Sequence, residues 1–167
     1  NAILAFHALT GDQFASGVNP ITNKEGWWNH LIGPGKAIDT QKYFVICANV
    51  IGGCMGSYGP SNINPKTNKN FGTEFPVLTI NDMVNAQYHL LEFFKIKKLF
   101  SVLGGSMGGM QVLQFVSNFP DKSETAIPIA CTHSHSAQNI ALNELGRQSI
   151  MADHNWANGF YEENSKS

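Results

Sequence analysis

One stretch of the sequence decides the fold: Leu99-Phe100-Ser101-Val102-Leu103-Gly104-Gly105-Ser106-Met107-Gly108-Gly109. Its first five residues form an apolar run typical of a buried β-strand. Residues 110–119 then carry apolar side chains at helical spacing, and Pro120 cannot extend a helix. The stretch therefore predicts a glycine-rich corner between a strand and a helix, with Ser106 at its centre.

Further strands and helices alternate along the chain. The predicted strands are residues 2–6, 43–50, 99–103 and 125–131, and the predicted helices are residues 80–95, 110–119 and 136–151. Thr79 and Asp82 have the spacing of a capping box at the first of these helices. Alternation of this kind indicates a mostly parallel sheet with helices on both faces.

Two long segments lie between these elements. Residues 7–42 hold a short predicted helical turn at 27–31, and residues 51–76 are rich in Gly and Pro. Connections of this length inside a domain are usually functional. No linker or repeat divides the chain, so we expect one partial domain over residues 1–167, and the polar residues 162–167 are expected to be loosely held.

The composition excludes several classes of protein. The 167 residues are 43% apolar and 14% charged, with 11 basic and 12 acidic side chains. Without an excess of positive charge, nucleic-acid binding is disfavoured. No apolar stretch is long enough to cross a bilayer, so no membrane association is expected. The three cysteines form no CxxC pair, which argues against a metal centre or a disulfide framework.

The residues Gly104-Gly105-Ser106-Met107-Gly108 match the nucleophile-elbow pattern G-x-S-x-G. A chain that turns from strand to helix within two residues strains the central backbone, and flanking side chains would collide with the neighbouring elements. The serine oxygen then projects from the sheet edge, and the helix that begins at Met107 directs N–H groups toward an oxyanion. A tight structural turn is the alternative interpretation.

A second oxyanion donor has to come from the loop after an earlier strand. Residues 7–12, His-Ala-Leu-Thr-Gly-Asp, follow the first strand directly. His7 and Asp12 themselves are better interpreted as a satisfied strand-end histidine and a turn former.

Motifs spread over nearly the whole chain resemble the homoserine O-acetyltransferase family of methionine biosynthesis. The matching segments are residues 7–12, 27–28, 33–40, 43–47, 52–57, 104–111, 135–141 and 146–148. Tyr58 departs from the Thr expected there. The resemblance implies an α/β-hydrolase fold, incomplete at both ends in this chain.

The resemblance also implies roles for individual residues. Ser106 would be the nucleophile, and the backbone N–H groups of Leu9 and Met107 would line the oxyanion hole. The enzyme would move an acetyl group from acetyl-CoA to the hydroxyl of L-homoserine through an acyl-serine, with no cofactor besides this donor. Residues 51–61 would shape the pocket.

Two further side chains have competing interpretations. Arg147 could hold the homoserine carboxylate, although a surface ion pair on a helix is the commoner role. Cys54 could be a reactive thiol, but a packing residue in a glycine turn is the simpler interpretation.

The acid and the base of a Ser-Asp-His triad are missing from the sequence. They should follow further strands after Ser106, which this chain does not contain. His133 and His135 follow the fourth strand, but the family places its catalytic histidine farther downstream. Asp153 and His154 are neighbours whose side chains should diverge on a helix. Since the chain also lacks an initial Met, we expect a piece of a longer enzyme, inactive alone.

Other functions remain open from the sequence alone. A homoserine O-succinyltransferase, a serine esterase or hydrolase, and a binding module that has lost catalysis would share this corner. The absence of an N-x-[ST] sequon agrees with a cytoplasmic protein. Relatives of this kind imply a homodimer for the full-length enzyme.

Overall fold

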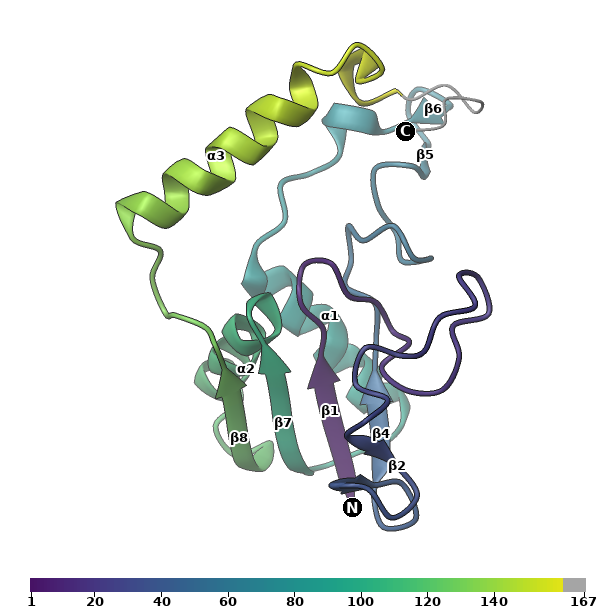
Figure 1. Cartoon of the computed structure of the whole chain (residues 1–167), viewed down its shortest axis with the longest axis vertical. Coiled ribbons are helices and arrows are strands. Elements are labelled where there is room, and N and C mark those ends of the chain that lie inside the picture. The colour runs from purple at the N-terminus through teal and green to yellow at the C-terminus, as the bar shows by residue number, and fades with distance from the viewer. Residues whose placement is uncertain (161–167) are drawn as a thin grey trace. The chain divides into compact units, whose positions relative to one another are not determined.

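The structure, a computed structural model, describes residues 1–160 (Figure 1). The chain forms two compact units: residues 1–57 together with 78–133, and residues 58–77 together with those from 134 onward. The tail at residues 162–167, expected to be loosely held, lies outside the described residues. The single partial domain over residues 1–167 stays a prediction.

The first unit is built on a four-stranded sheet. Its strands are, in spatial order, β4 (Phe44–Cys47), β1 (Ala2–Phe6), β7 (Leu99–Gly105) and β8 (Ser123–Ile129). All three pairings are parallel, as predicted, and Leu4 is in register with both Ile46 and Val102. The arrows in Figure 1 therefore point the same way, and the loops after the strands gather at one edge of the sheet.

The strand β4 is shorter than the predicted span of residues 43–50. It ends at Cys47, and the N–H of Val50 bonds the ring of His7 instead of a neighbouring strand. Residues 48–50 thus belong to a loop, in which the ring of His7 accepts the N–H of Val50.

Two helices pack on the first unit: α1 (Ile80–Phe93) and α2 (Met107–Asn118). The capping box is confirmed, since the Thr79 hydroxyl accepts the N–H of Asp82 and the Asp82 carboxylate accepts the N–H of Thr79. Their buried side chains share one core with alternate residues of β1, a core that includes Leu4, Phe6, Val84, Leu91, Val112 and Phe115. Both helices of this unit therefore cover the same face of the sheet.

The reason lies in the connection between β1 and β4, which carries no helix. The predicted helical turn at 27–31 is a set of hydrogen-bonded turns, followed by the two-residue strands β2 (Ile32–Gly33) and β3 (Ile38–Asp39). This irregular segment covers the other face beside β4, where the Cys47 Sγ lies 3.6 Å from the carbonyl oxygen of Asp12.

The second unit contains short elements and one long helix. They are β5 (Ile63–Asn64), β6 (Lys69–Asn70), the 3-10 turns η1 (Gly72–Glu74) and η2 (Ala157–Gly159), and α3 (Ala137–Met151). The helix predicted at 136–151 is confirmed, with Ser136 as its N-cap. None of its residues is buried. Within residues 1–160, no helix is long and apolar enough to span a membrane.

Candidate active site

Ser106 occupies the corner between β7 and α2. Its backbone has φ +56° and ψ −121°, a left-handed conformation that non-glycine residues seldom adopt. Its N–H donates to the carbonyl of Ile129 at 3.0 Å, and its carbonyl accepts the N–H of Met110 at 3.1 Å. The residue is exposed, and its hydroxyl has no hydrogen-bond partner among residues 1–160. The strained backbone is thus anchored on both sides and presents a free oxygen.

The glycines around Ser106 are required by close backbone approach, as the sequence predicted. A Cβ on Gly104 would lie 2.6 Å from the carbonyl oxygen of Gly108. A Cβ on Gly108 would collide with the carbonyl of Phe6, at the end of β1. By contrast, a Cβ on Gly105 would meet nothing within 4 Å. The two flanking glycines, rather than Gly105, therefore allow the start of α2 to lie against the end of β1.

Both predicted oxyanion donors lie beside this contact. The N–H of Gly11 bonds the carbonyl of Ala8 at 2.9 Å, which closes a turn with Leu9 in it. No described group accepts the N–H of Leu9, and this residue is 74% exposed. Met107 is the first residue of α2, where a helix leaves its N–H groups without intrahelical acceptors. These two amides belong to the loop and the helix that meet at Gly108.

His7 is a buried, satisfied side chain, as expected. Its Nε2 accepts the N–H of Val50 at 3.0 Å, and its Nδ1 lies 2.7 Å from the carbonyl oxygen of Ala8. Since a carbonyl only accepts, Nδ1 carries the proton and the ring is neutral. His7 therefore ties the loop after β1 to the loop after β4, and both of its ring nitrogens are occupied.

Asp12 is a turn former, also as expected. Its carboxylate accepts the N–H of Phe14 at 2.8 Å and the side-chain amide of Asn19 at 3.1 Å. Next to it, the side-chain amide of Gln13 donates to the carbonyl of Met55 at 3.0 Å. The loop after β1 is thus bonded a second time to the glycine-rich loop at 50–57.

The two cysteines near these loops differ in environment. Burial, and then the nearby charge of Asp12, raise the pKa of the Cys47 thiol to about 12. Such a thiol is protonated and inert at neutral pH. Cys54 is exposed, so the packing role expected for it is wrong. It lies in a turn in which Gly52 and Gly56 have positive φ.

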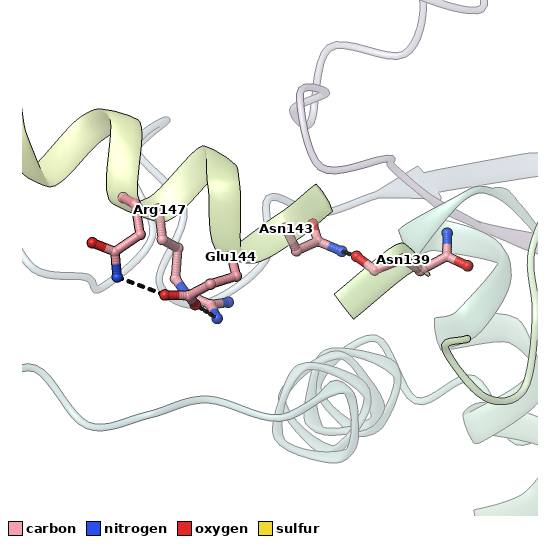
Figure 2. Close-up of polar contacts among 5 residues, drawn as sticks. Asn139, Asn143, Glu144 and Arg147 are labelled. Carbon is pink, nitrogen blue, oxygen red and sulfur yellow. Dashed lines mark hydrogen bonds and ion pairs between the residues drawn. The ribbon is translucent and has the colours of Figure 1, made fainter. Parts of the chain in front are cut away.

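Arg147 has the surface role that the sequence left open. Figure 2 shows its guanidinium directed at the carboxylate of Glu144, one turn away on α3. The amide of Asn143 bonds the backbone of Asn139 in the same picture. Arg147 is thus paired within its own helix.

No described histidine is bonded to Ser106. His133 and His135 are exposed, as is His154. The prediction that Asp153 and His154 diverge is wrong: they follow the end of α3, and the His154 Nδ1 lies 3.8 Å from the Asp153 carboxylate. Both side chains are largely exposed, so this is a surface pair. Within residues 1–160, no cluster of three His, Cys, Asp or Glu could hold a metal.

Sequence reasoning missed a buried pair of amides behind the corner. Gln87 of α1 donates to the side-chain oxygen of Gln111 of α2 at 3.0 Å. The nitrogen of Gln111 lies 3.5 Å from two backbone carbonyls, those of His7 and Met107. The one available signal was Gln87 itself, a polar residue that interrupts the apolar stripe of its helix.

A family model described as the alpha/beta hydrolase fold matches residues 1–167. The chain belongs to the alpha/beta hydrolase fold family. The fold inferred from the sequence is confirmed. The strained Ser106 lies between β7 and α2, the kind of strand-to-helix turn at which this fold carries its nucleophile elbow.

This member of the alpha/beta hydrolase fold family is similar to an acetyltransferase over all 167 residues. It is 77% identical over 167 residues to "Homoserine O-acetyltransferase" of Pelagibacter ubique (strain HTCC1062), covering 100% of this chain and 45% of that protein. The resemblance inferred from the motifs is therefore confirmed.

Solved structures of two kinds of enzyme share its fold. The crystal structure of esterase E22 has a TM-score of 0.88 at 37% identity, over 98% of this chain and 46% of that one. Homoserine O-acetyltransferase from Bacillus anthracis has a TM-score of 0.87 at 34% identity, over 99% of this chain and 46% of that one. The chain thus spans less than half the length of these relatives.

Proposed function

We propose that this chain carries the nucleophile of an acyltransferase that moves an acetyl group from acetyl-CoA to the side-chain hydroxyl of L-homoserine. The observation that carries the proposal is the exposed hydroxyl of Ser106, held by a left-handed backbone between β7 and α2. The 77% identity to a homoserine O-acetyltransferase supports the choice of donor and acceptor. The N–H groups of Leu9 and Met107 are the proposed oxyanion hole.

The reaction takes place in two steps. Ser106 Oγ attacks the thioester carbonyl of acetyl-CoA, its proton passes to a general base, and the thiol of CoA leaves. The homoserine hydroxyl then attacks the acyl-serine, and Ser106 regains a proton as O-acetylhomoserine departs. In both steps the carbonyl oxygen becomes negatively charged, and the two N–H groups together with the positive end of α2 stabilise that charge.

Among residues 1–160, no side chain that could act as a general base is hydrogen-bonded to the Ser106 hydroxyl. A serine without a base is a weak nucleophile at neutral pH. We expect the base and its acidic partner from the half of the longer relatives that this chain does not match. Residues 1–167 alone are therefore expected to be inactive.

A serine esterase is the second candidate. Its support is the structure of esterase E22, whose TM-score of 0.88 to this chain is close to the 0.87 of the acetyltransferase from Bacillus anthracis. The two reactions share the acyl-serine and differ in whether water or homoserine removes the acetyl group. A succinyl donor has no such support among the relatives described above.

The test is a chimera in which residues 1–167 replace the matching stretch of the Pelagibacter ubique relative, since 77% of positions are already identical. Release of CoA that depends on homoserine, with formation of O-acetylhomoserine, is the expected result. Release of CoA at the same rate without homoserine would identify an esterase. Ser106→Ala should abolish both, and unchanged activity in this variant would remove Ser106 from catalysis.

The partners of the complete enzyme follow from the same reasoning. Its substrates are two small molecules, and the chemistry needs no metal or further cofactor, no nucleic acid and no membrane. We expect a cytoplasmic homodimer, as the resemblance implies.

A further inference from the structure

Gln111 is the polar side chain buried deepest behind the corner. It is fully buried in α2, and Gln87 of α1 is 3% exposed. Leu4, Val84, Val112 and Phe115, all within the same core, are apolar. Burying two primary amides in such a core costs free energy unless both are hydrogen-bonded, so their presence calls for an explanation.

The direction of the Gln111 amide is determined by its partners. Gln87 supplies a donor to the Gln111 oxygen at 3.0 Å, so the Gln111 nitrogen has to point the other way. There it lies 3.5 Å from the carbonyl of His7 and 3.5 Å from that of Met107, both of which only accept. One NH₂ group with two hydrogens thus lies between two carbonyls.

These two carbonyls belong to the two sides of the proposed oxyanion hole. His7 begins the loop that presents the N–H of Leu9, and Met107 supplies the second N–H itself. Gly108 already sets how closely α2 approaches β1, because its missing Cβ would collide with Phe6. Gln111 adds a polar link across the same junction.

The pair is not arranged for stability alone. The side-chain oxygen of Gln87 is buried without a hydrogen-bond partner among the described residues. A fully apolar pair would avoid that cost. The arrangement keeps an unsatisfied acceptor in the core while a donor is held toward the two carbonyls.

We propose that Gln111 is a positioning residue that holds the two sides of the oxyanion hole at a fixed separation, with Gln87 orienting its amide. This inference rests on the proposed function of Ser106, Leu9 and Met107. It predicts a defect in the chemical step, because a small displacement of an oxyanion donor slows acyl transfer far more than it weakens binding.

The experiment uses the chimera described above and two substrates. Formation of the acyl-serine is followed as the burst of nitrophenol from p-nitrophenyl acetate, which needs no homoserine. Steady-state kcat and KM are measured with acetyl-CoA and homoserine. The variants are Gln111→Met, the double variant Gln87→Met/Gln111→Met, and the control Gln114→Met, whose amide on the same helix bonds Asn118 at 2.8 Å.

We expect Gln111→Met to slow acylation and to lower kcat by about tenfold or more, with KM within about twofold of the parent. The double variant leaves no amide at either position, so it should keep the parent's melting temperature and show the same kinetic defect. Gln114→Met should leave both rates within about twofold.

The inference is overturned if the double variant is folded and acylates at the parent's rate, or if its loss of rate is accompanied by an equal rise in KM. Failure of the proposed function is a separate result. A parent chimera that gives the nitrophenol burst but no O-acetylhomoserine would contradict the acetyltransfer to homoserine, and Gln111 could still be judged from the burst alone.

Discussion

The backbone of Gly108 lies directly against the carbonyl of Phe6, with no room for a side chain between them. This contact joins the end of β1 to the first turn of α2. The loop that begins at His7 and the helix that follows Ser106 consequently begin at residues that are in direct contact. The predictions below are to be tested in the chimera with the Pelagibacter ubique relative.

Gly108→Ala should force β1 and α2 apart. Its Cβ would overlap backbone atoms, which cannot rotate away as a side chain could, so we expect a loss of about 1–3 kcal/mol in the free energy of unfolding and a larger loss of acylation rate. Denaturant titration and the nitrophenol burst measure the two. Gly105→Ala is the matched control for stability, since its Cβ meets nothing within 4 Å. Equal destabilisation by both variants would contradict the steric argument.

His7→Phe should loosen the link between the loops after β1 and β4. The N–H of Val50, which lies in a buried residue, would lose its acceptor at a cost of about 1–3 kcal/mol. His7→Gln can place an oxygen near the position of Nε2 and should cost less. Amide hydrogen exchange at Val50 is the direct measurement, and unchanged protection in His7→Phe would refute the proposed link.

Cys47 should resist alkylation while Cys54 reacts. The pKa of the Cys47 thiol is raised from 9.0 to about 12, chiefly by burial, whereas Cys54 is exposed. Mass spectrometry after treatment with iodoacetamide at pH 8 distinguishes the two sites. Labelling of native Cys47 as fast as Cys54 would show that the loop over β4 opens readily.

Because of the raised pKa of Cys47, the free energy of unfolding should depend on pH in the alkaline range. Between about pH 9 and 12 the unfolded chain loses the Cys47 proton and the folded chain keeps it. The unfolded state then binds fewer protons, so the free energy of unfolding falls as pH rises. In Cys47→Ala this part of the alkaline loss should disappear, and an identical pH profile in both proteins would argue against a buried thiol.

Gly146→Ala should stabilise α3. Gly146 lies inside this helix, its Cβ would meet nothing within 4 Å, and alanine is favoured over glycine in a helix by about 0.5–1 kcal/mol. Hydrogen exchange across residues 137–151 should slow by about threefold. Gly35→Ala is the opposite case: space is open there too, but φ is +69°, so alanine should destabilise its turn.

The features that the sequence predicted well are local ones. The strand before Ser106, the capping box of Thr79 and Asp82, and the glycines of the corner each depend on neighbours within a few residues. The fold class followed from their alternation, and the roles of His7 and Asp12 as structural residues were also recognisable from position.

The features that the sequence did not predict depend on distant partners. Valine is typical of strands, but the N–H of Val50 donates to the ring of a histidine 43 residues away. Gln87 interrupts an apolar stripe in the sequence, and only the structure shows that its amide donates to the side-chain oxygen of Gln111. The covering of one sheet face by an irregular loop also has no local pattern, because that loop is held by scattered contacts such as the 2.9 Å bond from the Trp27 indole to the carbonyl of Asp12.

The positive φ at Ser106 limits which hydroxyl-bearing residue can occupy this position. Threonine offers the same hydroxyl, but branching at its Cβ makes a left-handed backbone a true outlier. The conservative exchange of serine for threonine is therefore unfavourable at this position, although both side chains carry a hydroxyl.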